Sequence, residues 1–130
     1  MCGIYITNLG YSKSQILEKI ERIKFRGPDN KNFKKINDIS IAHLRLSIID
    51  LDIRSNQPFE YNGYYLSYNG EIYNYKEVRK KLIDLGYSFD TLSDTEVLIK
   101  AYDYWGSNMV IELNGMFAFA IYDSTKEIIF

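Results

Sequence analysis

Short runs of β-branched and aromatic residues alternate along this sequence with segments of helical spacing. Residues 3–7 (GIYIT), 64–68 (YYLSY) and 116–130 have the composition of strands, and DSTK within the last of these predicts a hairpin turn. Residues 39–52 (ISIAHLRLSIIDLD) are too rich in β-branched residues for a solvent-facing helix, so we expect them to be extended. Because strands and helices are mixed along the chain, the pattern predicts an α+β or layered α/β fold.

Three segments carry helix start and stop signals. Residues 11–24, 75–85 and 94–105 place apolar side chains at helical spacing, and each has a residue type that caps helices within or just before its first turn. The expected N-caps are Ser12 or Ser14, Asn74 with Glu77 in a capping box, and Ser93 with Glu96 in a second one, and the expected stops are Gly86 and Gly106.

The remaining stretches are rich in turn residues. RGPD at residues 26–29 ends the first helical segment and is typical of a turn. Residues 30–38 (NKNFKKIND) and 53–63 (IRSNQPFEYNG) are expected to form surface loops.

Composition narrows the function classes. The chain is 46% hydrophobic and 25% charged, with a formal net charge of −1, which is typical of a globular domain and provides no basic surface for nucleic acid. A single cysteine cannot form an internal disulfide, and no apolar run is long enough to span a membrane. We therefore expect one domain in a reducing, cytoplasmic setting.

That single cysteine is Cys2, directly after the initiator methionine. A lone cysteine is often only a small buried apolar residue. At position 2, however, removal of Met1 would leave a thiol and an α-amine on one residue. Their reference pKa values are close, about 8.5 and about 8, so the amine can accept the thiol proton and return it to a leaving group. Cys2 is therefore a candidate nucleophile that needs no histidine.

Five further positions have both a structural and a functional interpretation. Asn69 and Gly70 are typical of a turn, but a side-chain amide beside an unobstructed backbone N–H also suits an oxyanion hole. Asp94 opens a helical segment and could face a ligand ammonium. Arg45 lies in an apolar run, where it needs either an internal carboxylate or a ligand carboxylate. His43, on the same face of that run, is more typical of a structural histidine.

Together, a thiol nucleophile, an oxyanion hole, an arginine and an aspartate describe a site for an amino acid with a cleavable side-chain carbonyl. Glutamine fits this description. The ordered motifs MCGI, RGPD, RLSIID, NQPF, NGEIYNY, SDTEVLI and NGMFAFAIYD resemble the glutaminase domain of glutamine-hydrolysing asparagine synthetases. These are class II glutamine amidotransferases, and the resemblance covers essentially the whole chain, so residues 1–130 are expected to form a partial glutaminase domain.

The resemblance implies an N-terminal-nucleophile hydrolase fold, a four-layer α/β/β/α sandwich of two antiparallel sheets. It implies hydrolysis of glutamine to glutamate and ammonia through a γ-glutamyl thioester on Cys2, with the α-amine as general base. The other roles it implies are an oxyanion hole at Asn69 and Gly70, and glutamine binding by Arg45, the backbone of Leu46, Ser47, Ile48 and Ile49, Glu71 and Asp94.

Two departures from the family pattern qualify this expectation. Ala42 stands where the family usually has glycine. Family domains also continue beyond the strand that ends at Phe130, and a synthetase domain follows them, so the fold is expected to be incomplete at its C-terminal side. ATP and Mg would bind only that absent domain, and no metal or cofactor is expected here. The ammonia acceptor would be a synthetase domain or subunit, and homodimer formation is left open.

Two alternatives remain at this stage. The chain could be an inactive or truncated domain that acts as a docking module, because a final apolar strand favours association by edge pairing. It could also be a glutaminase domain that serves a different amine acceptor, as in amidophosphoribosyltransferase or glucosamine-phosphate synthase. Thiol amidases of the same fold also begin with cysteine, but they would not need Arg45 and Asp94 for a free amino acid.

Overall fold

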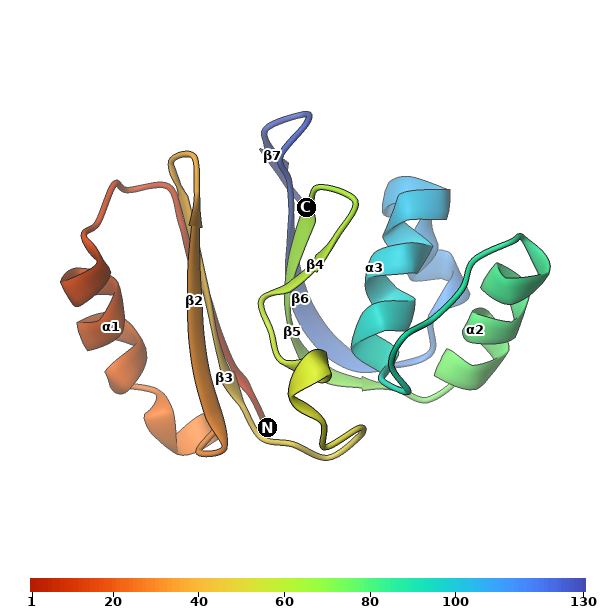
Figure 1. Ribbon diagram of the computed structural model, residues 1–130, viewed down its shortest axis with the longest axis horizontal. Helices are drawn as coiled ribbons and strands as arrows, with labels where there is room; N and C mark the ends of the chain where they lie inside the picture. Colours follow the sequence, from red (N-terminus) through yellow and green to blue (C-terminus); the bar gives the residue numbers. More distant parts are fainter.

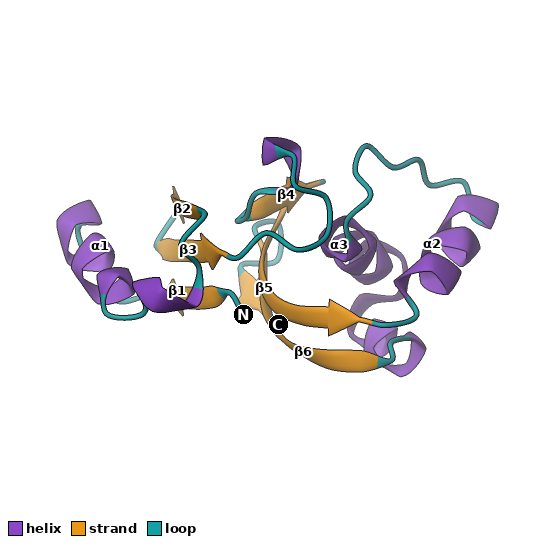
Figure 2. Ribbon diagram, turned by 90° about the horizontal axis from the view of Figure 1, so that it is seen from below, coloured by secondary structure: helices purple, strands orange, loops and turns teal.

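The computed structural model describes residues 1–130 as four layers. Helix α1 covers one sheet, a second sheet packs behind the first, and α2 and α3 cover the far face of the second sheet (Figure 1). The view turned by 90° shows the same order, with both sheets between the helices (Figure 2). The predicted four-layer sandwich of two antiparallel sheets is confirmed, and none of the helices is long and apolar enough to span a bilayer.

The first sheet has the order β1-β3-β2, with β1 at Gly3–Thr7, β2 at Asn30–Ile36 and β3 at Ile39–Arg45. Both neighbours of β3 are antiparallel to it. The expected loop at residues 30–38 is therefore wrong, because most of it forms β2. The lysines that favoured a loop are typical of an edge strand, where charged side chains discourage pairing with other chains.

The second sheet has the order β4-β5-β6-β7, all antiparallel. The loop expected over residues 53–63 contains a short 3₁₀ turn and β4. The run at 64–68 extends to Ile72, so Asn69 and Gly70 lie within a strand and not in a turn. The bounds are β4 Phe59–Tyr61, β5 Tyr64–Ile72, β6 Gly115–Asp123 and β7 Ile128–Ile129.

The helices form where their spacing predicted. They are α1 Lys13–Glu21, α2 Tyr75–Asp84 and α3 Asp94–Trp105, with 3₁₀ turns at Lys24–Arg26, Ile53–Ser55 and Gly106–Glu112. Helix α1 packs on the first sheet around Ile16 and Ile20, while α2 and α3 enclose the larger core with β5 and β6. Each sheet therefore has its own helical cover, and the faces between the sheets are left to meet each other.

Of the three expected N-caps, Ser12 and Ser93 are confirmed and Asn74 is wrong. Ser12 caps α1 in a full capping box with Gln15. Asn74 precedes α2 without capping it, because its amide bonds the backbone of Glu112 and Asn114 and fastens the start of α2 to the start of β6. Ser93 does accept from the Glu96 N–H.

The Glu96 carboxylate does not complete the second box. It accepts instead from the backbone N–H groups of Asp90 and Thr91, from the Thr91 hydroxyl and from Lys100. Glu96 therefore holds the loop that leads into α3. Gly106 ends that helix with φ 57°, as predicted.

Candidate active site

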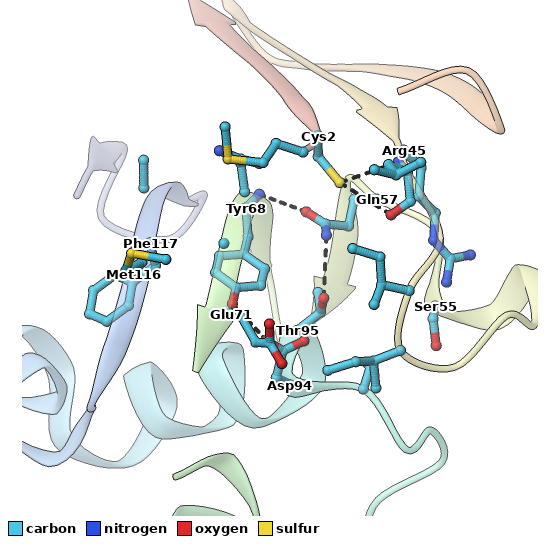
Figure 3. A pocket seen from close by; sticks show the side chains of 18 residues that line it. Cys2, Arg45, Ser55, Gln57, Tyr68, Glu71, Asp94, Thr95, Met116 and Phe117 are labelled. Carbon is cyan, nitrogen blue, oxygen red and sulfur yellow. Dashed lines mark hydrogen bonds between the residues drawn. The ribbon is translucent and has the colours of Figure 1, made fainter. Parts of the chain in front are cut away.

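One cavity of about 350 Å³ opens where the N-terminus, the end of β3, the middle of β5 and the start of α3 meet (Figure 3). It is lined by nine of the ten residues expected at the site, all except Ser47. Those nine are Cys2, Arg45, Leu46, Ile48, Ile49, Asn69, Gly70, Glu71 and Asp94.

Cys2 precedes β1 by one residue and lies at one end of this cavity. Its Sγ is 3.3 Å from the backbone N of Leu46, which donates to it, and 3.6 Å from the backbone O of Leu46, to which it donates. Its own carbonyl accepts from Arg26 Nε at 2.9 Å. The half-buried thiol is therefore held at both backbone and side chain, and Met1, 72% exposed, sits beside it.

The RGPD segment supports this end of the site. Besides the Arg26 bond, the Asp29 carboxylate accepts from the Ser47 N–H at 2.7 Å, and Ser47 does not line the cavity. A side chain at Gly27 would place its Cβ 2.2 Å from the Leu44 carbonyl, so this turn needs glycine to lie against β3. The segment is thus a brace for Cys2 and the chain after β3.

The free edge of β5 faces the cavity. Strand β4 pairs with β5 only as far as Leu66, so the alternate backbone groups beyond it have no neighbouring strand. The Tyr68 N–H donates to Gln57 Oε1 at 2.6 Å, and the Ile72 N–H donates to Asp94 Oδ2 at 3.2 Å. Gly70 lies between them at the two-residue period of the strand, so its N–H faces the same edge.

Gly70 must be glycine for a separate reason. Its φ is 153°, and a Cβ there would lie 2.3 Å from the Met116 carbonyl oxygen on β6. The neighbouring Asn69 has a buried Oδ1 with no partner within the protein. A buried polar atom of this kind costs free energy unless a ligand or water satisfies it. Both predicted oxyanion residues line the cavity, but the unpartnered Asn69 Oδ1 is an acceptor, so a hydrogen bond to an oxyanion has to come from Asn69 Nδ2.

Asp94 is the first residue of α3 and is 5% exposed. Its Oδ2 accepts from the Tyr68 hydroxyl at 2.6 Å and from the Ile72 N–H, so one carboxylate oxygen is fixed and the other is left for the cavity. Burial and the nearby Asp94 carboxylate raise the pKa of Tyr68, which keeps that hydroxyl a donor. The expected position of Asp94 at a helix start is confirmed.

Arg45 ends β3 and is also 5% exposed. Its Nη1 donates to the Asp52 carbonyl and Asn56 Oδ1, and its Nη2 donates to the Asp50 carbonyl. All three acceptors are neutral oxygens, and Arg45 forms no ion pair with a carboxylate of the chain. Of the two partners considered for Arg45 from its sequence, the internal carboxylate is therefore absent.

Several lining residues were missed by the sequence interpretation: Ser55, Gln57, Tyr68, Ser93, Thr95, Met116, Phe117 and Ala118. Gln57 lies between Cys2 and Thr95 in Figure 3, and Ser55 has a buried Oγ with no hydrogen-bond partner. The NQPF motif was the only signal for Gln57. Met116, Phe117 and Ala118 come from β6, and no local pattern separates its cavity-lining residues from its core residues.

His43 stands behind the site, between the two sheets. Its Nε2 is 3.0 Å from the Tyr68 carbonyl, and burial lowers the pKa of His43 to about 4. It does not line the cavity, which agrees with a structural histidine. Nowhere do three His, Cys, Asp or Glu side chains come close enough together to hold a metal ion.

Comparison with known proteins gives the same picture. Asparagine synthetase [glutamine-hydrolyzing] 3 of Bacillus subtilis is 35% identical over 100% of this chain and 22% of its own length. Putative asparagine synthetase [glutamine-hydrolyzing] 2 of Methanocaldococcus jannaschii is 37% identical over 100% of this chain and 29% of its own length. The chain therefore spans less than a third of these relatives.

Among solved structures, the glutamine phosphoribosylpyrophosphate (PRPP) amidotransferase from B. subtilis matches with a TM-score of 0.58 and 27% identity. The match covers 67% of this chain and 21% of that one. The family model for the glutamine amidotransferase domain matches residues 1–130. The chain belongs to the glutamine amidotransferase domain family.

Proposed function

We propose that this chain, after removal of Met1, hydrolyses glutamine to glutamate and ammonia with Cys2 as nucleophile. The Cys2 α-amine takes the thiol proton, and Sγ attacks the side-chain amide carbon. The resulting ammonium returns its proton to the departing nitrogen, so ammonia leaves and a γ-glutamyl thioester remains. Water then attacks the thioester with the same amine as base, and glutamate departs as the thiol is restored.

The developing oxyanion lies at the free edge of β5. The Gly70 N–H and the Asn69 amide supply its hydrogen bonds, which support the tetrahedral intermediate more strongly than the flat amide. Since neighbouring N–H groups on that edge are already bonded to Gln57 and Asp94, the Gly70 group is the one left for substrate.

The ends of glutamine are held by opposite charges. Three of the five N–H donors of Arg45 are bonded to loop oxygens, which leaves Nε–H and one Nη2–H for the α-carboxylate. The free oxygen of Asp94 receives the α-ammonium. Leu46, Ile48 and Ile49 line the same cavity, and Glu71 follows the oxyanion residues on β5. Ser47 contributes indirectly, through the bond from its N–H to Asp29.

The observation that carries this proposal is the placement of Cys2. Its thiol is bonded to the Leu46 backbone within the same cavity that holds an unpaired arginine and a fixed aspartate. A merely structural cysteine would be packed among apolar side chains, away from ligand-sized space. This one faces a cavity with both charges that a free amino acid needs.

The ammonia would pass to a synthetase-type domain that makes asparagine. ATP and Mg would bind that domain and not residues 1–130, and the reaction would take place in the cytoplasm. Support for this part comes from the asparagine synthetases that the chain resembles. The PRPP amidotransferase match favours a second candidate, the same glutaminase chemistry serving another acceptor. Glutaminase activity alone does not distinguish these, so ammonia transfer to each acceptor type is the discriminating assay.

Intact mass before and after exposure to a glutamine analogue with an electrophile at its side-chain carbonyl tests the chemistry. We expect loss of one methionine, one adduct, and release of glutamate and ammonia from glutamine. Because Cys2 is the only cysteine, the adduct site is unambiguous, and Cys2→Ala should remove both adduct and hydrolysis.

An N-terminal extension that keeps Cys2 within a peptide bond is the matched control for the amine. It should still react with iodoacetamide but lose hydrolysis by about 1,000-fold or more, because the base is gone. A processed, folded chain that takes no adduct would overturn the proposal in favour of a docking module. Full hydrolysis by the extended chain would overturn the role of the amine.

A further inference from the structure

Gln57, from the NQPF motif, has no role in the chemistry above, yet its side chain is 5% exposed and lines the cavity. It reaches two elements at once. Its Oε1 accepts from the Tyr68 N–H of β5 at 2.6 Å, and its Nε2 donates to Thr95 Oγ1 of α3 at 3.3 Å. Figure 3 shows both bonds crossing the cavity wall below Cys2.

The first of these bonds replaces a missing strand. If β4 began earlier in the chain, its pairing with β5 would continue past Leu66 to Tyr68 and then to Gly70, and it would cover the donor proposed for the oxyanion. Gln57 satisfies Tyr68 alone. The edge is thereby fixed two residues before Gly70, and the Gly70 N–H stays open toward the cavity.

The second bond ties that edge to the helix. Thr95 follows Asp94, which itself accepts from Tyr68 and Ile72 of the same strand. Gln57 and Asp94 therefore clamp the free edge of β5 on either side of Gly70. A shift of this edge by a few tenths of an ångström would misalign a donor whose value depends on its position in the transition state.

We propose that Gln57 is a positioning residue that sets the oxyanion donor of β5, and that it acts on the transition state and not on glutamine binding. This inference rests on the proposed glutaminase function. According to it, Gln57 affects the turnover rate, whereas Arg45 and Asp94 determine the affinity for glutamine.

The test compares Gln57→Met with the unchanged sequence in the full chain. Methionine keeps the length and volume of the side chain but removes both hydrogen bonds. We expect kcat for glutamine hydrolysis to fall on the order of 10-fold or more, somewhat less than the loss of a whole oxyanion donor, with KM within about threefold. Affinity for the γ-aldehyde analogue of glutamine, which forms a tetrahedral adduct with the thiol, should fall in parallel with kcat.

Three measurements separate positioning from damage. The rate of Cys2 alkylation by iodoacetamide should not change, because the thiol itself is untouched. Thr95→Val, which removes only the acceptor of Gln57 Nε2, should lower kcat about threefold, and Thr95→Ser should restore it. Gln15→Met, at the distant capping box of α1, is the matched control and should leave kcat and KM unchanged.

The outcomes distinguish this inference from the function on which it rests. If the unchanged chain hydrolyses glutamine and a folded Gln57→Met chain keeps its kcat, or changes only KM, the positioning role is wrong and the glutaminase stands. If Gln57→Met does not fold, equal kcat in Thr95→Val and Thr95→Ser overturns the role. If the unchanged chain takes no analogue at Cys2, the proposed function falls and the inference falls with it.

Discussion

Two buried cations in this molecule are treated in opposite ways. Lys100, on α3, is 4% exposed and pairs with the Glu96 carboxylate at 2.6 Å, between the rings of Tyr61 and Phe89. Arg45, at the cavity, is 5% exposed and bonds only neutral oxygens of the loop after β3.

The difference separates structure from binding. A buried charge is tolerated when an opposite charge and hydrogen bonds compensate it, and around Lys100 that compensation is complete within the chain. Around Arg45 the hydrogen bonds are partly supplied and the opposite charge is not. The charge of Lys100 on α3 is therefore compensated within the chain, and the charge of Arg45 at the cavity is not. An uncompensated cation of this kind is what a binding site for a carboxylate ligand requires.

The largest effect is expected on stability, from breaking the buried ion pair of Lys100 and Glu96. Lys100→Met leaves Glu96 buried without its cation and should lower the free energy of unfolding by about 3 kcal/mol. Urea denaturation measures this loss, and KM of the folded variant for glutamine should stay within about threefold of the unchanged value. The double variant Glu96→Gln/Lys100→Met should recover at least half of the stability; no recovery would mean that packing, and not charge, is responsible.

Removing the uncompensated cation Arg45 should weaken glutamine binding instead. Arg45→Met should raise KM for glutamine about 100-fold, since the loss of a hydrogen-bonded charge partner for a ligand costs about 2–5 kcal/mol. The matched substrate is 4-aminobutanamide, which lacks the α-carboxylate. The unchanged chain should prefer glutamine strongly, and Arg45→Met should lose that preference. A variant that discriminates as well as the parent would refute the assignment of Arg45.

His43 is a third buried basic side chain, and it is buried in its neutral form. Its pKa is about 4 in the folded chain and about 6.5 when unfolded, so below pH 6.5 the unfolded state binds the extra proton. Stability should therefore fall as pH drops from 6.5 toward 4, with a His43 contribution of about 2 kcal/mol lost by pH 5. His43→Gln, whose amide can still donate to the Tyr68 carbonyl, should flatten that part of the stability profile in denaturation at pH 5 and pH 8. An identical profile in the variant would remove His43 as the cause.

The same profile should steepen again at lower pH. Burial would raise the pKa of Glu96, but the bonds from Lys100, Asp90 and Thr91 outweigh it and leave that pKa lowered. Its contribution is present above about pH 4.5 and is lost as pH falls through the lower, folded value. The Lys100→Met chain should show a smaller loss in this range.

The smallest effect is expected at the surface. Lys80 and Asp84 form an i,i+4 pair at 2.8 Å, with both side chains more than half exposed. Lys80→Ala should change the free energy of unfolding by less than about 0.5 kcal/mol, because solvent and salt screen such pairs. This variant is the baseline against which the loss at Lys100 is judged. A loss near that of Lys100→Met would show that burial does not set the difference between them.

Local signals located the helices better than the strands. Ser12, Ser93 and Gly106 define helix ends through contacts within a few residues, so they could be identified from the sequence. β2 could not, because its lysine-rich sequence matches a loop unless a neighbouring strand is known. The Asn74 and Glu96 side chains met distant or competing partners, which no capping pattern specifies.

The candidate site divides in the same way. Cys2, Arg45, Asn69, Gly70 and Asp94 are residue types whose chemistry can be argued one at a time, and the sequence alone was sufficient to bring them forward. Ser47, in contrast, was expected in the pocket, yet its N–H is bound by Asp29. The residues next to Ser47 in the sequence do not predict this contact with Asp29.

What the sequence by itself determined is the chemical inventory: a thiol at position 2, an arginine in an apolar strand, an aspartate at a helix start and a layered mixture of strands and helices. Only the tertiary structure decided which donors remain open. Gly70 is available because the pairing of β4 with β5 stops at Leu66 and Gln57 bonds Tyr68, and Arg45 is unpaired because the loop around it offers neutral oxygens. Whether a donor stays unbonded depends on all of its neighbours in space, whereas a sequence pattern shows only its neighbours along the chain.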